Sequence, residues 1–591
     1  MKAFLAVAWQ PGVAIRFRRP DPRVLACLTD DDTPVGAVHA AENGWTACAG
    51  PDAGDSIVGD DGSFTIRIGR MARTPERDVP TSDLPAMIMD GRDLTSMLPP
   101  FAAVHRAHRS APLTIVSDWL GFHQLFWWRG NGVVAASTSA RALAALADAG
   151  FDAVGLGVQA MIGWQIGDHT MFRGVRTFPP ATVATLDGGR IVQRQYADPP
   201  AAAARTPNLD DAVAEMASVL RGWQQSYLSD HPDAVLQLTG GHDSRILLAA
   251  TPQQMRAGLN ALTLGDPDSD DAEIAARLAA PFQMNHVVHR LDEQAWPTPQ
   301  GAHDLSLAAA RALHCQASPL ALVPLLLAEA HLDQGHRLSG LGGEVARGFY
   351  YAGQPRRART TGQLIERLAN WRLFSNESVE AQALDSTFLA SARDTTIAAL
   401  KSLFAPGDWL RATDEFYLMH RMHRWAGAHG TVAAVRRHYV NPMFDRRFVE
   451  LALGVAPRDK RDSLLLGRLM KELDPKLARI PLDSGLSPAR LGTRSVVTTL
   501  ATQTLAARKV TLKVSQRLTR ARRPQLGAAE AAALVLTHWR AEPKTCQALY
   551  DVTSDGAPVL QPRWLDDVLS GGRHAQPTTV AFLVDLLAAT T

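Results

Sequence analysis

The residues most able to carry chemistry lie in one short stretch near the middle of the chain. The apolar run 236–238 is followed directly by the string TGGHDS at 239–244. Paired glycines let the backbone approach a ligand without a Cβ in the way. A helix that begins behind them presents N–H groups and the positive end of its dipole to an anion. With two hydroxyls and the Asp243 carboxylate, which can hold Mg²⁺, the stretch predicts a pyrophosphate cradle.

This spacing differs from the Walker A loop, because the pattern G-x-x-x-x-G-K-S/T and its lysine are missing. A Gly-Gly pair after a strand can also be no more than a tight turn into a helix. The full string T-G-G-x-D-S is more specific, and it resembles the phosphate loop of the ATP pyrophosphatases. Those enzymes cleave ATP between its α and β phosphates and leave AMP on the substrate.

The elements around this stretch predict a parallel sheet. Residues 210–228 have helical periodicity, 234–238 and 259–265 are apolar strands, and helices follow each strand. Strands that alternate with helices are typical of a parallel α/β sheet. The positions from about 355 to 480 are mostly helical in pattern.

The first part of the chain predicts a different domain. Short β-type runs are separated there by Gly, Asp, Asn and Pro turns. A connection rich in Pro and Ala follows, and the character of the sequence changes after it. We therefore expect two domains, residues 1–196 and residues 208–591, with an overall α/β fold class and an α+β N-terminal domain.

Further motifs resemble those of the asparagine synthetases, over roughly residues 1–490. The loop SGLGGE at 339–344 is similar to the glycine loop that lines the adenylate and binds Mg²⁺ in that family. Leu264 falls where the family packs the adenine. The string at 440–452 is similar to one in the helical half of the synthetase domain, and DWLG at 118–121 resembles a segment of its first domain.

The resemblance implies an architecture and a site. The first domain would be an Ntn-hydrolase-like sandwich, and the second a PP-loop ATP pyrophosphatase domain with a helical extension. ATP and Mg²⁺ would be the cofactors, with the metal on Asp243 and Glu344, and the catalytic residues would be Asp243, Glu344 and Arg421. The expected ATP-binding residues are Gln237, Thr239, Gly240, Gly241, Asp243, Ser244, Leu264, Ser339 and Gly340.

Three departures from the family bear on the subfamily. Glutamine-using members need a cysteine directly after the initiator Met, where this chain has Lys2, so we expect no glutaminase activity. Leu341 stands where the synthetases usually carry Glu. The stretch 479–488 lacks the family's catalytic Lys, and Arg490 is one candidate substitute, with a surface arginine as the alternative.

Relatives that lack the cysteine and keep the ATP machinery include β-lactam synthetases and lasso peptide macrocyclases. The strings GGHDSR and RMHRWAGAHG resemble the lasso cyclases more. That resemblance implies adenylation of an Asp or Glu side chain of a precursor peptide and capture by its N-terminal amine, with a leader peptidase and a leader-binding protein as partners. A β-lactam synthetase-like or ammonia-dependent amidoligase remains an alternative, as does a non-enzymatic nucleotide- or peptide-binding protein.

Bulk properties limit other functions. Net charge is +2, and although nine Lys and Arg side chains and no acid occur within 484–529, no nucleic-acid reader motif accompanies them. The four cysteines form no CxxC pair, which argues against a zinc site or a disulfide framework. His420, His423 and His429 lack a carboxylate at a ligand offset. With neither a signal peptide nor a long apolar run expected, we predict a cytoplasmic protein that binds no membrane.

Overall fold

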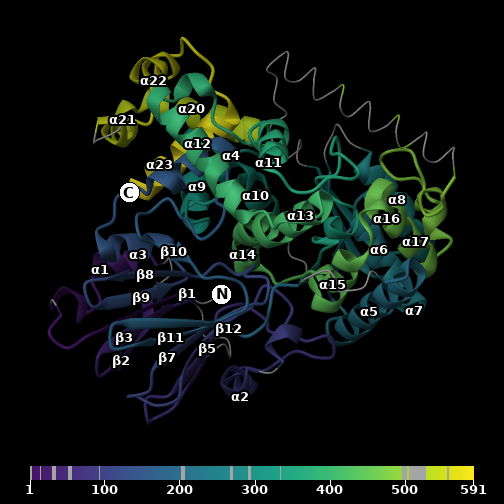
Figure 1. Ribbon diagram of the computed structural model, residues 1–591, viewed down its shortest axis with the longest axis horizontal. Coiled ribbons are helices and arrows are strands. Elements are labelled where there is room, and N and C mark those ends of the chain that lie inside the picture. Colours follow the sequence, from purple (N-terminus) through teal and green to yellow (C-terminus); the bar gives the residue numbers. More distant parts are fainter. Residues whose placement is uncertain are drawn as a thin grey trace.

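The computed structural model places a β sandwich, a parallel α/β sheet and a layer of helices side by side (Figure 1). The residues that it describes are 3–13, 15–28, 35–50, 56–91, 93–200, 207–265, 270–290, 295–332, 335–495, 502, 504, 511, 527–554 and 558–590. Lys2, much of the connection between the two expected domains and most of the basic segment fall outside these residues.

The sandwich consists of two antiparallel sheets of six strands each, in the orders β10-β8-β9-β1-β3-β2 and β12-β11-β7-β6-β5-β4. Their bounds are β1 Ala3–Trp9, β2 Val35–Ala41, β3 Gly44–Ala49, β4 Ser56–Val58, β5 Phe64–Arg67, β6 Ala102–Arg106, β7 Leu113–Ser117, β8 Phe126–Gly130, β9 Val133–Ser137, β10 Arg176–Thr177, β11 Thr182–Asp187 and β12 Arg190–Gln195.

The alternation of side chains along β1 explains the layering of this half. Successive strand residues point to opposite faces, so Phe4 and Ala6 pack against the second sheet while Leu5 and Val7 pack under helices. Helices α1 (Pro22–Ala26) and α3 (Ala140–Ala147) cover the outer face of the first sheet, and α2 (Leu84–Asp90) covers the second. The result is four layers, helix on sheet on sheet on helix.

The parallel sheet, which is separate from the sandwich, has five strands in the order β15-β14-β13-β16-β17. Helix α6 follows β13 and α8 follows β14, as the strand–helix alternation predicts. The bounds are α5 Leu209–Asp230, β13 Val235–Gln237, α6 His242–Ala250, α7 Gln253–Arg256, β14 Asn260–Gly265, α8 Asp271–Ala279, β15 Asn285–Arg290, β16 Arg337–Leu338 and β17 Tyr439–Val440.

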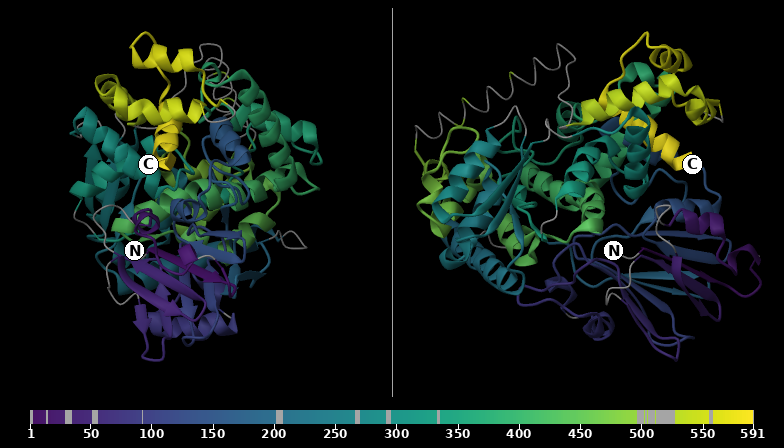
Figure 2. Two further views of the ribbon diagram at one scale, coloured as in Figure 1. Left: turned by 90° about the vertical axis from the view of Figure 1, so that its left-hand side faces the viewer. Right: turned by 180° about the vertical axis from the view of Figure 1, so that it is seen from behind.

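Helices make up most of the remaining chain and lie above the sandwich and beside the parallel sheet, as two further views show (Figure 2). Within this layer, Tyr417–Ala426 is π-helical, a rare conformation that is frequent at functional sites. The α-helices are α9 Pro299–Ala312, α10 Val323–His331, α11 Gly362–Leu368, α12 Ser386–Leu403, α13 Trp409–Phe416, α14 Gly427–Arg436, α15 Arg446–Gly454, α16 Pro457–Lys460, α17 Leu464–Leu473, α18 Pro488–Leu491, α20 Ala528–Ala541, α21 Gln547–Ser554, α22 Pro562–Leu569 and α23 Pro577–Thr590.

One helix of the first 196 residues packs with the later helices instead of with the sandwich. Helix α4 (Ala153–Ile162) lies against α12, where a Cβ on Gly157 would be 3.1 Å from Ala392. The Gln159 amide also donates to the Asp585 carboxylate of α23 over 3.0 Å. Bare glycine backbone thus lets two segments that are distant in sequence approach closely.

A second contact joins the sandwich to the π-helical segment. The Gln124 amide nitrogen donates to the backbone carbonyl of His423 over 2.6 Å. In return, the buried Arg424 guanidinium donates to the carbonyl oxygens of Gly167 (2.5 Å) and His169 (2.7 Å). Buried polar groups need such partners, so these bonds fix the segment against the first half of the chain.

The prediction of a mixed α/β chain is confirmed, because several sheets and many helices are present. Within the described part of the chain, no helix combines the length and the apolar character that a bilayer crossing requires.

Candidate functional site

The order of the parallel strands marks one crevice as the place for a ligand. From β13 the chain moves outward to β14 and β15, and it then returns to β16 on the other side of β13. Ligands of open α/β sheets bind at such a reversal point, outside the carboxyl ends of the strands. The two predicted loops, 239–244 after β13 and 339–344 after β16, both lie there.

The phosphate loop is held by its own hydroxyls. The Ser244 hydroxyl accepts the Thr239 N–H over 3.0 Å and lies 3.1 Å from the Thr239 hydroxyl. The Asp271 carboxylate of α8 accepts the Gly240 N–H over 2.8 Å. Gly241 is the N-cap of α6 and has no side chain to cap the first turn, so this end of the helix is open to a ligand.

The glycine loop after β16 packs backbone against backbone on the first turn of α6. A Cβ on Gly340 would lie 2.6 Å from the Asp243 carbonyl carbon, and one on Gly343 would lie 2.3 Å from the Asp243 carboxylate. A Cβ at Gly340 would clash with backbone, and one at Gly343 would force the Asp243 side chain to move. The two glycines therefore bring Glu344 up to Asp243.

Four polar side chains form one network at this point. Arg347 lies between the two carboxylates, with Nη2 3.3 Å from Asp243 Oδ2 and 3.2 Å from Glu344 Oε1. The Tyr417 hydroxyl, at the start of the π-helical segment, donates to Glu344 Oε2 over 2.9 Å. The predicted pair Asp243 and Glu344 is thus brought together, with an arginine bridge that the motifs did not indicate.

Burial dominates the electrostatics of Asp243. Loss of water raises the pKa of its carboxyl to about 7, the Arg347 guanidinium opposes that rise, and the Glu344 carboxylate adds to it. Two carboxylates held close together in a buried site favour a proton or another cation between them. Burial likewise lowers the pKa of the neighbouring His242 to about 3.

These residues fit an ATP–Mg²⁺ group. Asp243 Oδ1 is buried and has no hydrogen-bond partner among the described residues, so one carboxylate oxygen is left for a cation. The described ranges contain no cluster of three or more His, Cys, Asp or Glu side chains that could hold a metal by itself. Mg²⁺ suits such a place, since it is usually held by one or two carboxylates together with substrate phosphates and water.

Comparison with known proteins adds little to this geometry. No family model matches the chain, and no curated protein matches it. One solved structure that does match is described as the structure of the allosteric regulatory enzyme of purine biosynthesis, with 8% identity and a TM-score of 0.23. The match covers 49% of this chain and 80% of that chain. So low a score carries no argument about fold or activity.

The stretch 479–488, where the resembled family carries its catalytic Lys, lies beside the phosphate loop. The buried Arg245 of α6 donates to the Pro481 carbonyl (3.0 Å) and to the Gly240 carbonyl (3.2 Å). Arg490, the candidate substitute, is exposed on α18. The cation that faces the two carboxylates is Arg347.

Arg421 lies one turn beyond Tyr417 along the π-helical segment. Its guanidinium sits over the rings of Trp425 (4.3 Å) and Phe349 (5.3 Å) and is 3.9 Å from the Glu377 carboxylate. Phe349 in turn packs against Tyr417, with ring centroids 4.9 Å apart. Arg421 therefore belongs to an aromatic wall next to the acid pair, and the carboxylate it pairs with is Glu377.

The sequence motifs indicated both loops and both carboxylates that the structure brings together, but not the residues that connect them. They located the phosphate loop, the glycine loop and both carboxylates, and they put Gln237 and Leu264 on neighbouring strands that end at the same edge. Arg347 and Tyr417 were missed. Arg347 follows Glu344 by three residues, and this spacing could have indicated that the two side chains lie close together. Tyr417 is 73 positions from Glu344, and no local pattern in the sequence indicates their contact.

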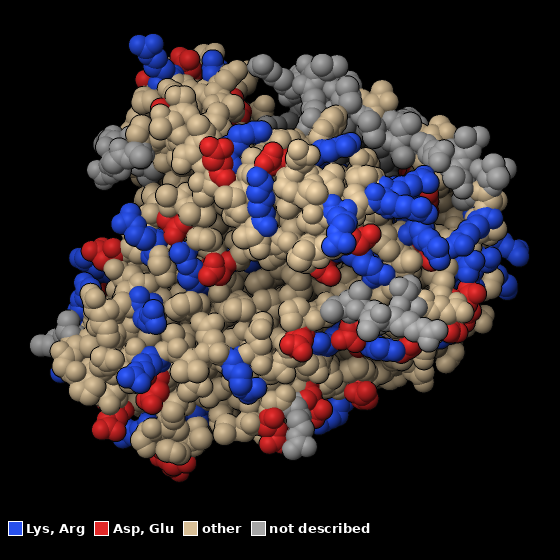
Figure 3. Space-filling model, viewed as in Figure 1, with Lys and Arg blue, Asp and Glu red and all other residues tan. Residues whose placement is uncertain are grey.

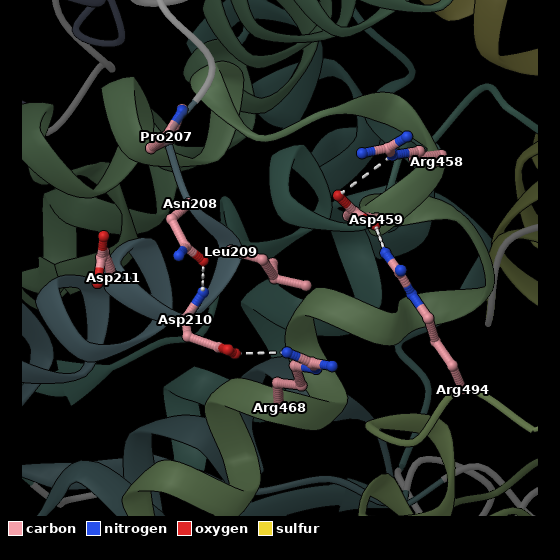
Figure 4. Close-up of a pocket in the computed structure, with 9 residues that line it drawn as sticks. All are labelled: Pro207, Asn208, Leu209, Asp210, Asp211, Arg458, Asp459, Arg468 and Arg494. Atoms are coloured by element: carbon pink, nitrogen blue, oxygen red, sulfur yellow. Dashed lines mark hydrogen bonds and ion pairs between the residues drawn. The ribbon is translucent and has the colours of Figure 1, made fainter.

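Two other features, the histidines of the π-helical segment and a separate cavity, do not indicate a second reactive site. Burial lowers the pKa of His420 to about 4 and lowers that of His423 well below its usual range, so both are neutral. A separate cavity of about 760 Å³ lies near the start of α5 and is shown in Figure 4. Asp210 pairs there with Arg468 and Asp459 with Arg494, and its remaining lining residues are Pro207, Asn208, Leu209, Asp211 and Arg458.

Proposed function

We propose that the chain is an ATP-dependent, AMP-forming carbon–nitrogen ligase. The observation that carries this proposal is the meeting of Asp243 and Glu344, from two loops on adjacent parallel strands, beside the open N-terminus of α6. A carboxylate substrate would attack the α phosphorus of ATP, and the bond to the β phosphate would break. An amine would then attack the acyl carbon, with AMP as the leaving group and one proton released.

Each part of the site has a role in this proposal. The phosphate loop and the α6 dipole would hold the departing pyrophosphate, since donors preorganised for developing charge are the main source of such catalysis. Asp243 and Glu344 would hold Mg²⁺, which supplies charge neutralisation at the phosphates. Gln237, Ser339 and Leu264 would line the nucleotide.

Arg347 and Tyr417 would set the geometry of the acid pair. The guanidinium keeps both carboxylates in place before nucleotide binds, and the phenol orients the second oxygen of Glu344. Arg347 is also the cation available to balance charge on the adenylate, the part that a lysine plays in the family this sequence resembles.

For the substrate, we propose a precursor peptide that is closed into a lasso-type ring. The chain would adenylate an Asp or Glu side chain, and the peptide's N-terminal amine would form the isopeptide bond. Ring closure costs chain entropy, and an enclosed site that holds both peptide ends offsets that cost. The aromatic wall of Phe349, Trp425 and Trp164 around Arg421 offers a surface on which a peptide can be ordered.

Several expectations accompany this proposal. The sandwich would be an Ntn-hydrolase-like domain without glutaminase chemistry, and the parallel sheet a PP-loop domain. A leader peptidase and a leader-binding protein would deliver the peptide in the cytoplasm.

Mass spectrometry tests the proposal directly. The protein is incubated with ATP, Mg²⁺ and a short precursor peptide encoded by a neighbouring gene, with its leader removed. A product lighter by one water and with a blocked N-terminus supports cyclisation. If pyrophosphate is released but free asparagine or a β-lactam accumulates, the adenylation survives and the peptide assignment fails. If ATP binds and no pyrophosphate ever appears, the chain is a binding protein.

A further inference from the structure

Arg106, the last residue of β6, occupies a position on the strand face that is otherwise apolar and buried. Along β6, Ala102 and Val104 point into the core between the two sheets. The alternation of strand residues sends Arg106 to the same side. Its side chain is buried (4% exposed), and its guanidinium lies over the ring of Phe64, 5.1 Å from the centroid.

This guanidinium lacks a counter-charge. Its Nε and Nη1 atoms are buried and have no hydrogen-bond partner within the described ranges, and no charged group among the described residues acts on the Arg106 guanidinium. Burial alone lowers its pKa. A buried charge without a partner costs several kcal/mol in general, so the position is expensive to maintain.

Other buried cations of the chain are partnered. Arg73 pairs with Asp78 and Asp230, and Arg337 pairs with Glu329. Lys460 pairs with Asp414. The buried Arg245 and Arg424 have no ion pair in the described part of the chain either, but both donate to backbone carbonyls. Arg106 differs from them because neither its Nε nor its Nη1 has a hydrogen-bond partner within the described ranges.

Arg106 lines a cavity of about 90 Å³ at one end of the sandwich. A cavity of about 10–15 Å³ is already large enough to hold one water molecule. A cavity of about 90 Å³ therefore has room for an ion of several atoms. Buried apolar side chains of Trp45, Leu113 and Leu186 form part of the wall. The charged groups at the lining are Arg109, Glu42 and Asp187, and all three are on exposed residues.

We propose that this cavity binds a small oxyanion, of the size of acetate or phosphate, with Arg106 as the residue that holds it. The Phe64 ring packs against the guanidinium, and the Nε and Nη1 donors have no partner among the described residues. A guanidinium fork matches the geometry of carboxylate and phosphate oxygens. Ser110 adds a hydroxyl and Arg109 a second positive charge at the same cavity.

The site is independent of the adenylation chemistry. Its lining residues all come from strands and turns of the sandwich, and none belongs to the loops around Asp243. A bound anion would supply the missing counter-charge between the two sheets and so would stabilise the sandwich by mass action.

Thermal unfolding tests this proposal on the full chain. Sodium acetate and sodium phosphate are titrated separately against sodium chloride at equal ionic strength. In the wild type, at least one oxyanion raises the melting temperature in proportion to the logarithm of its concentration, and the effective salt tells carboxylate from phosphate. In Arg106→Met the same shift disappears. Arg129→Met, an exposed arginine on β8 outside the cavity lining, is the matched control, and the whole shift remains there.

The variant without ligand adds a second readout. If Arg106 is unpaired until an anion binds, Arg106→Met should melt no lower than the wild type in chloride. The substitution removes an unpaired buried charge and keeps an aliphatic side chain of similar length. A melting temperature well below the wild type in chloride would instead give Arg106 a structural role. Equal oxyanion shifts in wild type and Arg106→Met, or no shift in either, overturn the site.

Crystals of the wild type provide a check that needs no variant. After a soak in sodium selenate, an unreactive tetrahedral analogue of phosphate, anomalous scattering from selenium beside Arg106 supports the proposal. A cavity that holds only water after that soak contradicts it.

Discussion

At the end of the sandwich a guanidinium is buried with no counter-charge, whereas at the carboxyl edge of the parallel sheet two partly buried carboxylates lie together with a partly exposed guanidinium and a buried phenol. The first cluster contains Arg106 over Phe64, and the second contains Asp243, Glu344 and Arg347. Apolar groups lie beside both sites, Trp45 and Leu113 at the first and Phe349 near the second, and a charge next to apolar surface is costly in isolation.

The difference lies in how the charge is balanced. The parallel sheet neutralises its acid pair through Arg347, and under the proposed function a cation and phosphates would have to replace only that contact. The sandwich leaves its cation unpaired. Such exceptions to local stability are typical of functional positions.

In Figure 3, Lys and Arg side chains also gather over the part of the molecule where α16 and α17 lie, on the side of the parallel sheet.

The largest effect is expected at Asp243. Asp243→Asn should lower ATP-dependent pyrophosphate release by about 10³-fold or more, as the loss of a main electrostatic group does. The same variant should melt slightly higher without ligand at pH 8, because it removes a buried ionised carboxylate. A pyrophosphate assay and a melting curve check the two effects. Asp394→Asn, an exposed acid on α12, is the control and should change neither.

Removing a partnered buried cation should destabilise the fold strongly. In Arg337→Met, the Glu329 carboxylate loses the guanidinium at 3.0 Å and keeps only Arg437 and Tyr439. We expect a loss of about 3 kcal/mol, typical of a broken buried pair, measured by denaturant unfolding. Arg106→Met, which leaves no carboxylate behind, is the comparison. If both variants lose equal stability, the contrast between the two regions is wrong.

Close packing of the glycine loop should matter for turnover. Gly343→Ala places a Cβ 2.3 Å from Asp243 Oδ1, so the carboxylate must move. Displacement of a reacting group by about 1 Å can cost about 10²-fold, and we expect a loss of that order in kcat. Gly222→Ala, where the space is open, is the matched control. Unchanged steady-state kinetics in Gly343→Ala would remove Asp243 from the chemistry.

A smaller effect should follow pH. Because burial raises the pKa of Asp243 to about 7, kcat/KM for ATP should rise about tenfold between pH 6 and pH 8 as the carboxyl loses its proton. The folded pKa lies above the unfolded one. Its contribution to stability is therefore complete below about pH 4 and is lost as the pH rises through about 7.

Arg347→Gln sharpens that test. The guanidinium holds the Asp243 pKa down, so its removal should move the rise in kcat/KM to higher pH. A profile that is flat in the wild type, or that does not move in this variant, shows that another group controls the rate.

Local pattern was enough for β1 and for the turn from β13 into α6. The run AFLAVAW predicts a strand, and TGGHDS predicts a turn into a helix, because each depends on neighbouring residues. Tyr417 and Arg347 meet at Glu344 only through the folded chain, and the π-helical segment has no sequence signal of its own. The burial of Arg106 could not be predicted from the sequence, since an arginine in a strand predicts an exposed side chain.

The domain prediction illustrates the same limit. The composition change near residue 200 marks where the chain passes from strands to helices, and α4 nevertheless packs with α12 and α23. Apolar helices carry no sign in their sequence of which neighbour they will cover.

The placement of α4 restricts how the gene for this protein can change. A shortened chain that began after the sandwich would lack the helix that covers Ala392, and Asp585 would lose the Gln159 amide that satisfies it. Separate production of either half would expose apolar surface that the other half normally covers, and such surface promotes aggregation. The sandwich can therefore be retained through long divergence as a folding partner, even if selection no longer maintains any reaction within it.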